Sequence, residues 1–264
     1  MTKFRGGNGR FVKNGGISAK KKFLREKNAE KQNFTSKIPE LGEKLNANST
    51  EINGFLTLPF SLTLSGCSGS GKSFFVRKLL MNQKEIIGSE WKKIFYISRF
   101  ELKDLQRELK HLPIVFINEI IPSLNELKQK SAKNEQNLVV LDDLMSQSAD
   151  SGDIKSLFSE GRHINFSVIY CTQNLFQGGR FARTIRLNTN YLVLFKQIHD
   201  RMQIERFFVS MKPKKWQFLI DCYDDATSNQ FGYFLLDFRP HVSHEFLRMR
   251  ASLDINTQIL YVES

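Results

Sequence analysis

The stretch "LTLSGCSGSGKSFFVRKLL", residues 62–80, constrains the fold more than any other part of the chain. β-forming residues lead into a glycine-rich loop, and the apolar residues after the loop recur at helical spacing. This order predicts a strand, a tight loop and the start of a helix. Glycines in such a loop let successive backbone N–H groups converge on phosphate oxygens, where the helix dipole adds positive charge. The stretch therefore predicts a polyphosphate-binding loop.

Two side chains of this loop have expected roles of their own. Lys72 is expected to reach the β- and γ-phosphates, and Ser73 to ligate Mg²⁺. A chance match is the alternative, but the strand before the loop and the helix after it argue against chance. We expect the nucleotide to be bound by the whole loop: Gly66, Cys67, Ser68, Gly69, Ser70, Gly71, Lys72 and Ser73.

From about residue 51 onward, apolar strands alternate with amphipathic helices. Strands are expected at 60–65, 93–98, 114–118, 138–142, 166–172, 191–196, 233–238 and 259–262, and helices at 73–87, 101–110, 124–133, 153–160 and 200–210. Several strands are continuous apolar runs, as in strands buried on both faces. The expected fold is a three-layer α/β sandwich of the P-loop NTPase class with a central, mostly parallel sheet, and ligands at the carboxyl ends of its strands.

A second motif, "NLVVLDDL", brings two acids to the end of a buried strand. Asp142 is expected to hold the Mg²⁺ shell, and Asp143 to orient or deprotonate a water aimed at the γ-phosphate. Many buried strands end in acids without any catalytic role, so the motif gains its weight from the glycine loop upstream. A pair of acids favours a hydrolysing motor over a switch protein, which needs only the first.

A third motif, "FSVIYCTQNLF", ends a buried strand in Thr172 and Gln173. The Gln173 amide is a candidate sensor that hydrogen-bonds both the attacking water and the γ-phosphate. The alternative is a polar residue that only caps the next turn.

Basic residues follow this strand in two groups. Three arginines, Arg180, Arg183 and Arg186, follow a glycine pair and have no acidic residues nearby in the sequence. Their charges are expected to face the γ-phosphate bound by a neighbouring subunit, DNA phosphates or simply solvent. If one of them completes a neighbour's active site, Arg183 is the first choice, with Arg162 as a further candidate. The segment "KPKKW", residues 212–216, is either an exposed charged turn or a DNA-facing loop.

Most of the net charge of +12 lies at the N-terminus. Residues 1–37 hold eleven Lys or Arg against two Glu, which gives +9 and leaves +3 for the rest. With few large apolar residues, we expect residues 1–50 to form a basic, largely disordered arm, and 51–264 the ATPase domain. The arm is expected to bind nucleic acid or to act as a nuclear address through "KKKFLREK"; a solvated leader is the alternative.

The cysteines and the apolar runs exclude several classes of protein. Cys67, Cys171 and Cys222 are odd in number and widely spaced, which argues against a disulfide framework and for a reducing compartment. The chain begins without an apolar run of the signal type, and its apolar runs are too short to cross a bilayer. We therefore expect a protein that is neither secreted nor transmembrane.

With these segments in order, the chain resembles the FtsK/HerA-type DNA-pumping ATPases, and most of all the genome-packaging ATPases of poxviruses, adintoviruses and Maverick/Polinton virus-like elements. The resemblance spans about residues 51–262 and rests on "LPFSLTLSGCSGSGKS", "LVVLDDL", "LFSEGRHINFSVIYCTQNLF", "RTIRLNTNYLVLFK" and "YDDATSNQFGYFLLDF". It implies a homo-oligomeric ring that uses ATP and Mg²⁺ to thread double-stranded DNA into a capsid, with a capsid or portal vertex protein as partner and no membrane. Expected locations are the host nucleus or a cytoplasmic virus factory, and the virion.

Carried over motif by motif, the resemblance implies that Lys72 and Ser73 bind phosphate and Mg²⁺. It also implies that Asp142 is the acidic residue that holds Mg²⁺, that Asp143 is the catalytic acidic residue, and that Gln173 is the sensor. The chain departs from the wider class at two of these places. Asp143 stands where a glutamate is common, and Cys67 is unusual within the loop; the basic arm is not part of the family pattern.

Other classes of protein share part of these features. A replication helicase or a helicase-loader ATPase would share the loop, the acids and the fold, and only the motifs after residue 160 favour packaging over it. A nucleotide kinase would need an arginine-rich lid and an acceptor site. A pure binding module would not need the second acid.

Overall fold

The computed structural model of the protein describes residues 56–144, 151–175, 182–241, 248–253 and 259–261. The predicted basic arm and Arg180 lie outside these residues. A nine-stranded sheet has the order β3-β2-β4-β5-β1-β6-β7-β8-β9. Its strands are β1 (Ser61–Ser65), β2 (Lys93–Ser98), β3 (Ile114–Asn118), β4 (Asn137–Asp142), β5 (Phe166–Thr172), β6 (Tyr191–Phe195), β7 (Tyr233–Asp237), β8 (Met249–Ala251) and β9 (Ile259–Leu260).

The sheet is parallel from β3 through β6 and antiparallel from β6 through β9. In the parallel part, Ser98 at the end of β2 pairs with Asp142 at the end of β4, and Ser65 at the end of β1 pairs with Thr172 at the end of β5. The carboxyl ends of these strands therefore meet at one edge. The prediction of a P-loop NTPase sandwich with a mostly parallel sheet is confirmed.

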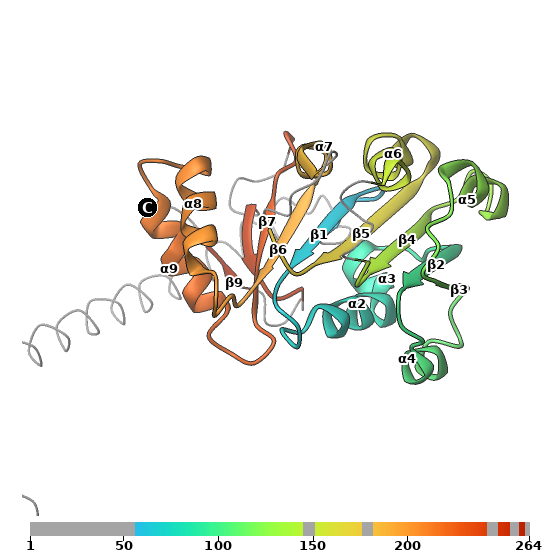
Figure 1. Cartoon of the computed structure of the whole chain (residues 1–264), viewed down its shortest axis with the longest axis horizontal. Helices are drawn as coiled ribbons and strands as arrows, with labels where there is room; N and C mark the ends of the chain where they lie inside the picture. The colour runs from blue at the N-terminus through green and yellow to red at the C-terminus, as the bar shows by residue number, and fades with distance from the viewer. Residues whose placement is uncertain (1–55, 145–150, 176–181, 242–247, 254–258, 262–264) are drawn as a thin grey trace, which may run out of the picture. The chain divides into compact units, whose positions relative to one another are not determined.

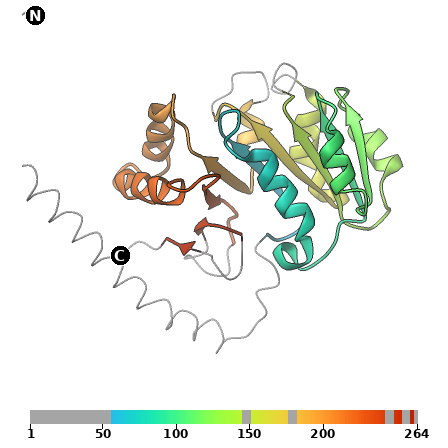
Figure 2. The same ribbon diagram turned by 90° about the horizontal axis from the view of Figure 1, so that it is seen from below.

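Helices cover both faces of the sheet (Figure 1). They are α2 (Lys72–Met81), α3 (Gln83–Ile87), α4 (Lys103–Glu108), α5 (Leu124–Lys130), α6 (Gly152–Glu160), the 3₁₀ helix η1 (Gly161–Ile164), α7 (Ala182–Leu187), α8 (Arg201–Met211) and α9 (Trp216–Ala226). Figure 2 shows α2 lying along one face, and α5, α6 and α7 lie on the other. None of the helices in the described part of the chain is long and apolar enough to cross a membrane.

Successive side chains of a strand point to opposite faces of the sheet, so each strand contributes to the cores on both faces. On β2, Ile94 and Tyr96 belong to the core under α2 and α3, whereas Phe95 and Ile97 belong to the core under α5 and α6. On β6, alternate residues likewise divide between the α2 core and a third core under α8 and α9. The apolar runs seen in the sequence thus reflect strands covered on both faces.

Most strand predictions agree with the structure within one or two residues, but the helix predictions need corrections. The single helix expected at 73–87 is two helices, because Asn82 caps α2 with both its backbone N–H and its side-chain amide on the Lys78 carbonyl. Helices α7 and α9 and strand β8 were not predicted. Helix α9 has buried residues at helical spacing, Leu219, Cys222, Tyr223 and Ala226, with Ile220 also buried, but its three aromatic residues, which favour strands, obscure the pattern.

Candidate nucleotide-binding site

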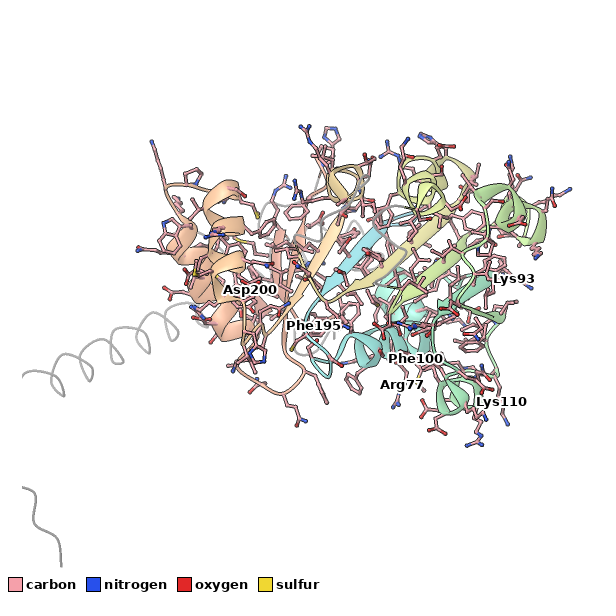
Figure 3. The ribbon with its side chains drawn as sticks, in the orientation of Figure 1. Arg77, Lys93, Phe100, Lys110, Phe195 and Asp200 are labelled. Carbon is pink, nitrogen blue, oxygen red and sulfur yellow. The ribbon has the colours of Figure 1, made fainter. Side chains whose placement is uncertain are left out.

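The glycine loop joins β1 to α2 at the carboxyl edge of the sheet. The Gly66 N–H donates to the Thr172 carbonyl at 3.2 Å, which fixes the start of the loop to the end of β5. Gly66 also sits where no side chain fits, because an added Cβ would lie 2.7 Å from the Cβ of Phe195. Figure 3 labels Phe195, the last residue of β6. Gly71 has φ 109°, a left-handed conformation that favours glycine. The backbone is thus bent into the loop expected for phosphate binding.

Lys72 places its charge inside the loop. Its Nζ donates to the carbonyl of Gly66 at 2.6 Å and to that of Cys67 at 2.9 Å. Among the described residues no side chain caps the N-terminus of α2, and no acid lies in its first turn. The ammonium group and the free N–H groups of the helix therefore combine to attract an anion at this point.

Asp142 and Ser73 meet between β4 and α2. Asp142 is the last residue of β4 and is buried, and its Oδ2 accepts a hydrogen bond from the Ser73 hydroxyl at 3.3 Å. A carboxylate and a hydroxyl beside a phosphate loop are the kind of oxygen donors that Mg²⁺ takes, with phosphates and waters supplying the rest. No cluster of three or more His, Cys, Asp or Glu suited to a metal occurs in the described part of the chain. The donor set therefore fits a Mg²⁺ ion shared with phosphate.

Tyr96 holds the same carboxylate from the neighbouring strand. It is fully buried on β2, and its hydroxyl donates to Asp142 Oδ2 at 2.7 Å. Burial, and then the Asp142 charge, raise the pKa of Tyr96 well above its usual value, and the same two causes raise the pKa of Cys171 on β5. Both groups therefore stay protonated, and the Asp142 carboxylate is surrounded by the hydrogen-bond donors Tyr96 and Cys171. Tyr96 was not among the predicted site residues, because its contact with Asp142 depends on the pairing of β2 with β4.

Asp143 faces a different partner. Its backbone has φ 54°, so the chain turns sharply after β4. Its Oδ1 accepts a hydrogen bond at 3.3 Å from the side-chain amide of Gln173, which lies just past the end of β5. The two adjacent acids thus differ in their surroundings: Asp142 contacts Ser73 and Tyr96, and Asp143 contacts the predicted sensor.

A chain of hydrogen bonds leads from Gln173 to α9. The Gln197 side-chain amide donates to the backbone carbonyl of Gln173 at 3.3 Å, and the backbone N–H of Gln197 donates to the Tyr223 hydroxyl at 2.8 Å. The Tyr223 hydroxyl in turn donates to the Phe195 carbonyl at 2.9 Å. Gln173 and Gln197 also line a polar hollow of about 110 Å³ at the start of α8. Neither Gln197 nor Tyr223 was predicted, since their role depends on contacts between distant segments.

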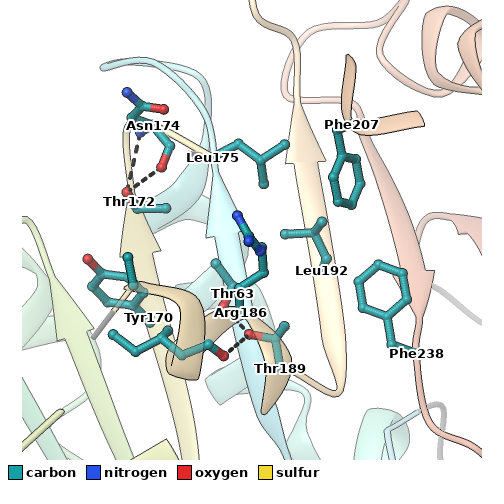
Figure 4. A pocket seen from close by; sticks show the side chains of 12 residues that line it. Thr63, Tyr170, Thr172, Asn174, Leu175, Arg186, Thr189, Leu192, Phe207 and Phe238 are labelled. Atoms are coloured by element: carbon teal, nitrogen blue, oxygen red, sulfur yellow. Dashed lines mark hydrogen bonds between the residues drawn. The ribbon is translucent and has the colours of Figure 1, made fainter. Parts of the chain in front are cut away.

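The predicted finger arginines lie apart from the loop. Arg183 and Arg186 are exposed on α7, whose Ile185 belongs to the core opposite α2, and Arg162 is exposed in η1. Arg186 lines a second cavity of about 60 Å³ with Thr63, Tyr170 and Thr172 (Figure 4). Among the described residues its lining includes none of 66–73. The structure thus brings Lys72, Ser73, Asp142, Asp143 and Gln173 to one edge and leaves Arg183 on another surface.

Comparison with known proteins found one matching family and several similar structures. A family model described as poxvirus A32 protein matches residues 49–212. The genome packaging NTPase B204 of Sulfolobus turreted icosahedral virus 2 is similar in its complex with AMP (12% identity, TM-score 0.46, 67% of this chain and 92% of that one). Its complex with ATP-gammaS gives 14% identity, a TM-score of 0.46, and 68% and 92% coverage.

A third similar structure is the KaiC-like protein PH0186 of Pyrococcus horikoshii OT3, with 11% identity, a TM-score of 0.39, and 77% and 90% coverage. No curated protein sequence matches the chain.

Proposed function

Because the chain belongs to the family of the poxvirus A32 protein, we propose that it is a viral genome-packaging ATPase that drives double-stranded DNA into a capsid. The observation that carries the proposal is that two adjacent acidic residues beside a phosphate loop have different hydrogen-bond partners. Asp142 accepts a hydrogen bond from Ser73, and Asp143 accepts one from Gln173. A site that only held nucleotide would not need the second pair. The finer assignment to the FtsK/HerA group is part of this proposal.

ATP binding uses the loop and the groups around it. Residues 66–73 surround the phosphates, with Lys72 at the β- and γ-phosphates and the α2 N-terminus directed at their charge. Ser73 and Asp142 would hold Mg²⁺, which when bound neutralises charge on the β- and γ-phosphates. Tyr96 keeps the Asp142 carboxylate in place by binding the oxygen that also accepts from Ser73.

Hydrolysis depends on the second pair. Asp143 accepts a hydrogen bond, and then the proton, from a water aligned with the γ-phosphate. Gln173 fixes the Asp143 carboxylate through its amide N–H, and its amide oxygen can orient the same water. Loss of the γ-phosphate changes the partners of Gln173, and the bonds through Gln197 and Tyr223 carry that change to α9. This is a route from chemistry to movement of the helices.

The remaining parts of the proposal concern assembly. Arg183, exposed on α7, is the first choice for a residue that completes the active site of a neighbouring subunit in a homo-oligomeric ring. The basic N-terminal residues would bind DNA phosphates, and a capsid or portal vertex protein would anchor the ring. The family supports a viral protein; the host nucleus, a cytoplasmic virus factory and the virion are the proposed locations.

The test is the ATPase rate of the full chain with and without duplex DNA, with an Asp143→Asn variant as the background control. A packaging motor should hydrolyse ATP faster with duplex DNA and should not separate its strands. DNA-stimulated hydrolysis with strand displacement would support a replication helicase instead. Turnover that is indifferent to DNA would refute the translocase.

A further inference from the structure

Two exposed aromatic rings lie together beside the phosphate loop. Phe74 of α2 is 48% exposed and Phe231, in the turn between α9 and β7, is 42% exposed. Their rings stack, with centroids 5.4 Å apart and an interplanar angle of 29°. Most phenylalanines of this chain whose burial is described are in the core, so two neighbouring rings in contact with water form a surface feature that needs an explanation.

The backbone at Phe231 adds a second observation. Its φ is 59°, a left-handed conformation that glycine and asparagine adopt far more readily than phenylalanine. A turn selected only for stability would have one of those residues there. Residues held in such conformations cluster at ligand sites, because the side chain is required in spite of the strain.

The aromatic pair begins where the phosphate loop ends. Phe74 directly follows Ser73, and a Cβ added to Gly71 would lie 2.9 Å from a ring carbon of Phe231, so this ring rests on the loop itself. The guanidinium of Arg77, which is on the next turn of α2 and is labelled in Figure 3, is 5.8 Å from the centroid of the Phe74 ring. Glu108 holds Arg77 with a hydrogen bond of 3.2 Å. An aromatic pair with a cation over the Phe74 ring thus continues the anion-binding loop.

We propose that Phe74 and Phe231 form a stacking surface for the nucleobase of the bound nucleoside triphosphate. This rests on the proposed function, since it requires the triphosphate to lie in the loop. A molecule with phosphates at one end and a flat aromatic base at the other matches a cationic loop followed by two exposed rings. Stacking uses the face that all bases share, so the surface contributes affinity without distinguishing adenine from guanine.

The test compares ligands with and without a base. The affinity of the full-length protein for Mg-ATP, Mg-GTP and inorganic tripolyphosphate is measured by calorimetry for wild type, Phe74→Leu and Phe231→Asn. Each variant should weaken ATP and GTP by the same factor, about tenfold to a hundredfold, as stacking on an aromatic side chain does. Tripolyphosphate affinity should change less than twofold. Phe231→Asn should also melt no lower than wild type, because asparagine suits the turn.

Met81→Ala is the matched control, since Met81 is on the same helix with 51% exposure and lies about 10 Å further along it. It should leave all three affinities unchanged. Unchanged ATP affinity in both phenylalanine variants would overturn the stacking surface but not the ATPase, and so would an equal loss of tripolyphosphate, which would mean that the loop itself was damaged. If wild type bound neither ATP nor tripolyphosphate, the proposed function and this inference would both be wrong.

Discussion

Replacing Asp143 by Asn removes one negative charge and changes little else in the fold. The Asp143 backbone is left-handed at φ 54°, and asparagine tolerates that conformation as well as aspartate does. The hydrogen bond from Gln173 ends on Oδ1 at 3.3 Å, and an amide oxygen can accept it in the same position. The free energy of unfolding should therefore stay within about 0.5 kcal/mol of wild type.

Turnover should fall much further than stability. An amide cannot take the proton of the attacking water, and loss of a positioned general base costs about 10² to 10⁴ in rate. Mg-ATP affinity should be nearly unchanged, since the carboxylate beside Ser73 is that of Asp142. The kcat is measured by phosphate release, the affinity by calorimetry and the stability by thermal unfolding.

Asp142→Asn is the matched comparison, because it removes the neighbouring charge. Asp142 accepts hydrogen bonds from Ser73 and Tyr96, so its loss should weaken Mg-ATP binding and raise the Mg²⁺ concentration needed for activity. The assignment of roles would be wrong if Asp143→Asn kept more than half of the wild-type kcat, or if the two variants lost affinity equally.

Four further predictions concern a buried tyrosine, the loop cysteine, an exposed arginine and the basic arm. Tyr96→Phe should raise the Mg²⁺ concentration for half-maximal turnover several-fold, and lower the free energy of unfolding by about 1.5–3 kcal/mol, because a buried carboxylate loses a donor; an unchanged Mg²⁺ titration would exclude a positioning role. Cys67 is partly exposed whereas Cys171 and Cys222 are buried, so an alkylating reagent should label Cys67 first and ATP should protect it; labelling indifferent to ATP would mean that the loop does not hold the phosphates. Arg183→Ala subunits mixed with Asp143→Asn subunits should show more activity than either variant alone. At some interfaces the intact active site of an Arg183→Ala subunit then faces the intact Arg183 of an Asp143→Asn subunit. No recovery in rings shown to be mixed and to tolerate an inactive subunit would move the assignment to another arginine. Deleting residues 1–37 should reduce the slope of log affinity for DNA against log salt by about 0.9 for each DNA phosphate that the arm neutralises; an unchanged slope would point to localisation as the role of the arm.

The sequence was informative wherever a feature depends on neighbours along the chain. Apolar runs predicted β2 and β5 at their observed bounds, because these strands are covered on both faces, and they also predicted the partly exposed edge strand β3. The loop and the strand-end acids were readable for the same reason, since Lys72 and Ser73 follow the glycines directly and Asp142 ends its strand. Strand β8 escaped prediction because three residues are too few to show a period.

Features that depend on pairing between distant segments could not be read in this way. Tyr96 reaches Asp142 only because β2 pairs with β4 in a register that sets it beside Val140. Gln197 and Tyr223 meet because α9 folds back against the end of β6. Phe231 reaches Gly71 through a turn 160 positions later in the chain. No local pattern marks these residues.

The turn that carries Phe231 lies outside the segment that the family model matches. The family match ends at residue 212, at the end of α8, whereas Tyr223 and Phe231 come from α9 and the turn after it. The matched segment holds the residues proposed for phosphate and water. The segment beyond it supplies Phe231, whose ring lies against Gly71, and Tyr223, which bonds to Gln197 and Phe195. On the stacking proposed for Phe231, substitution at residue 231 changes nucleotide affinity and leaves the predicted catalytic residues Lys72 and Asp143 in place.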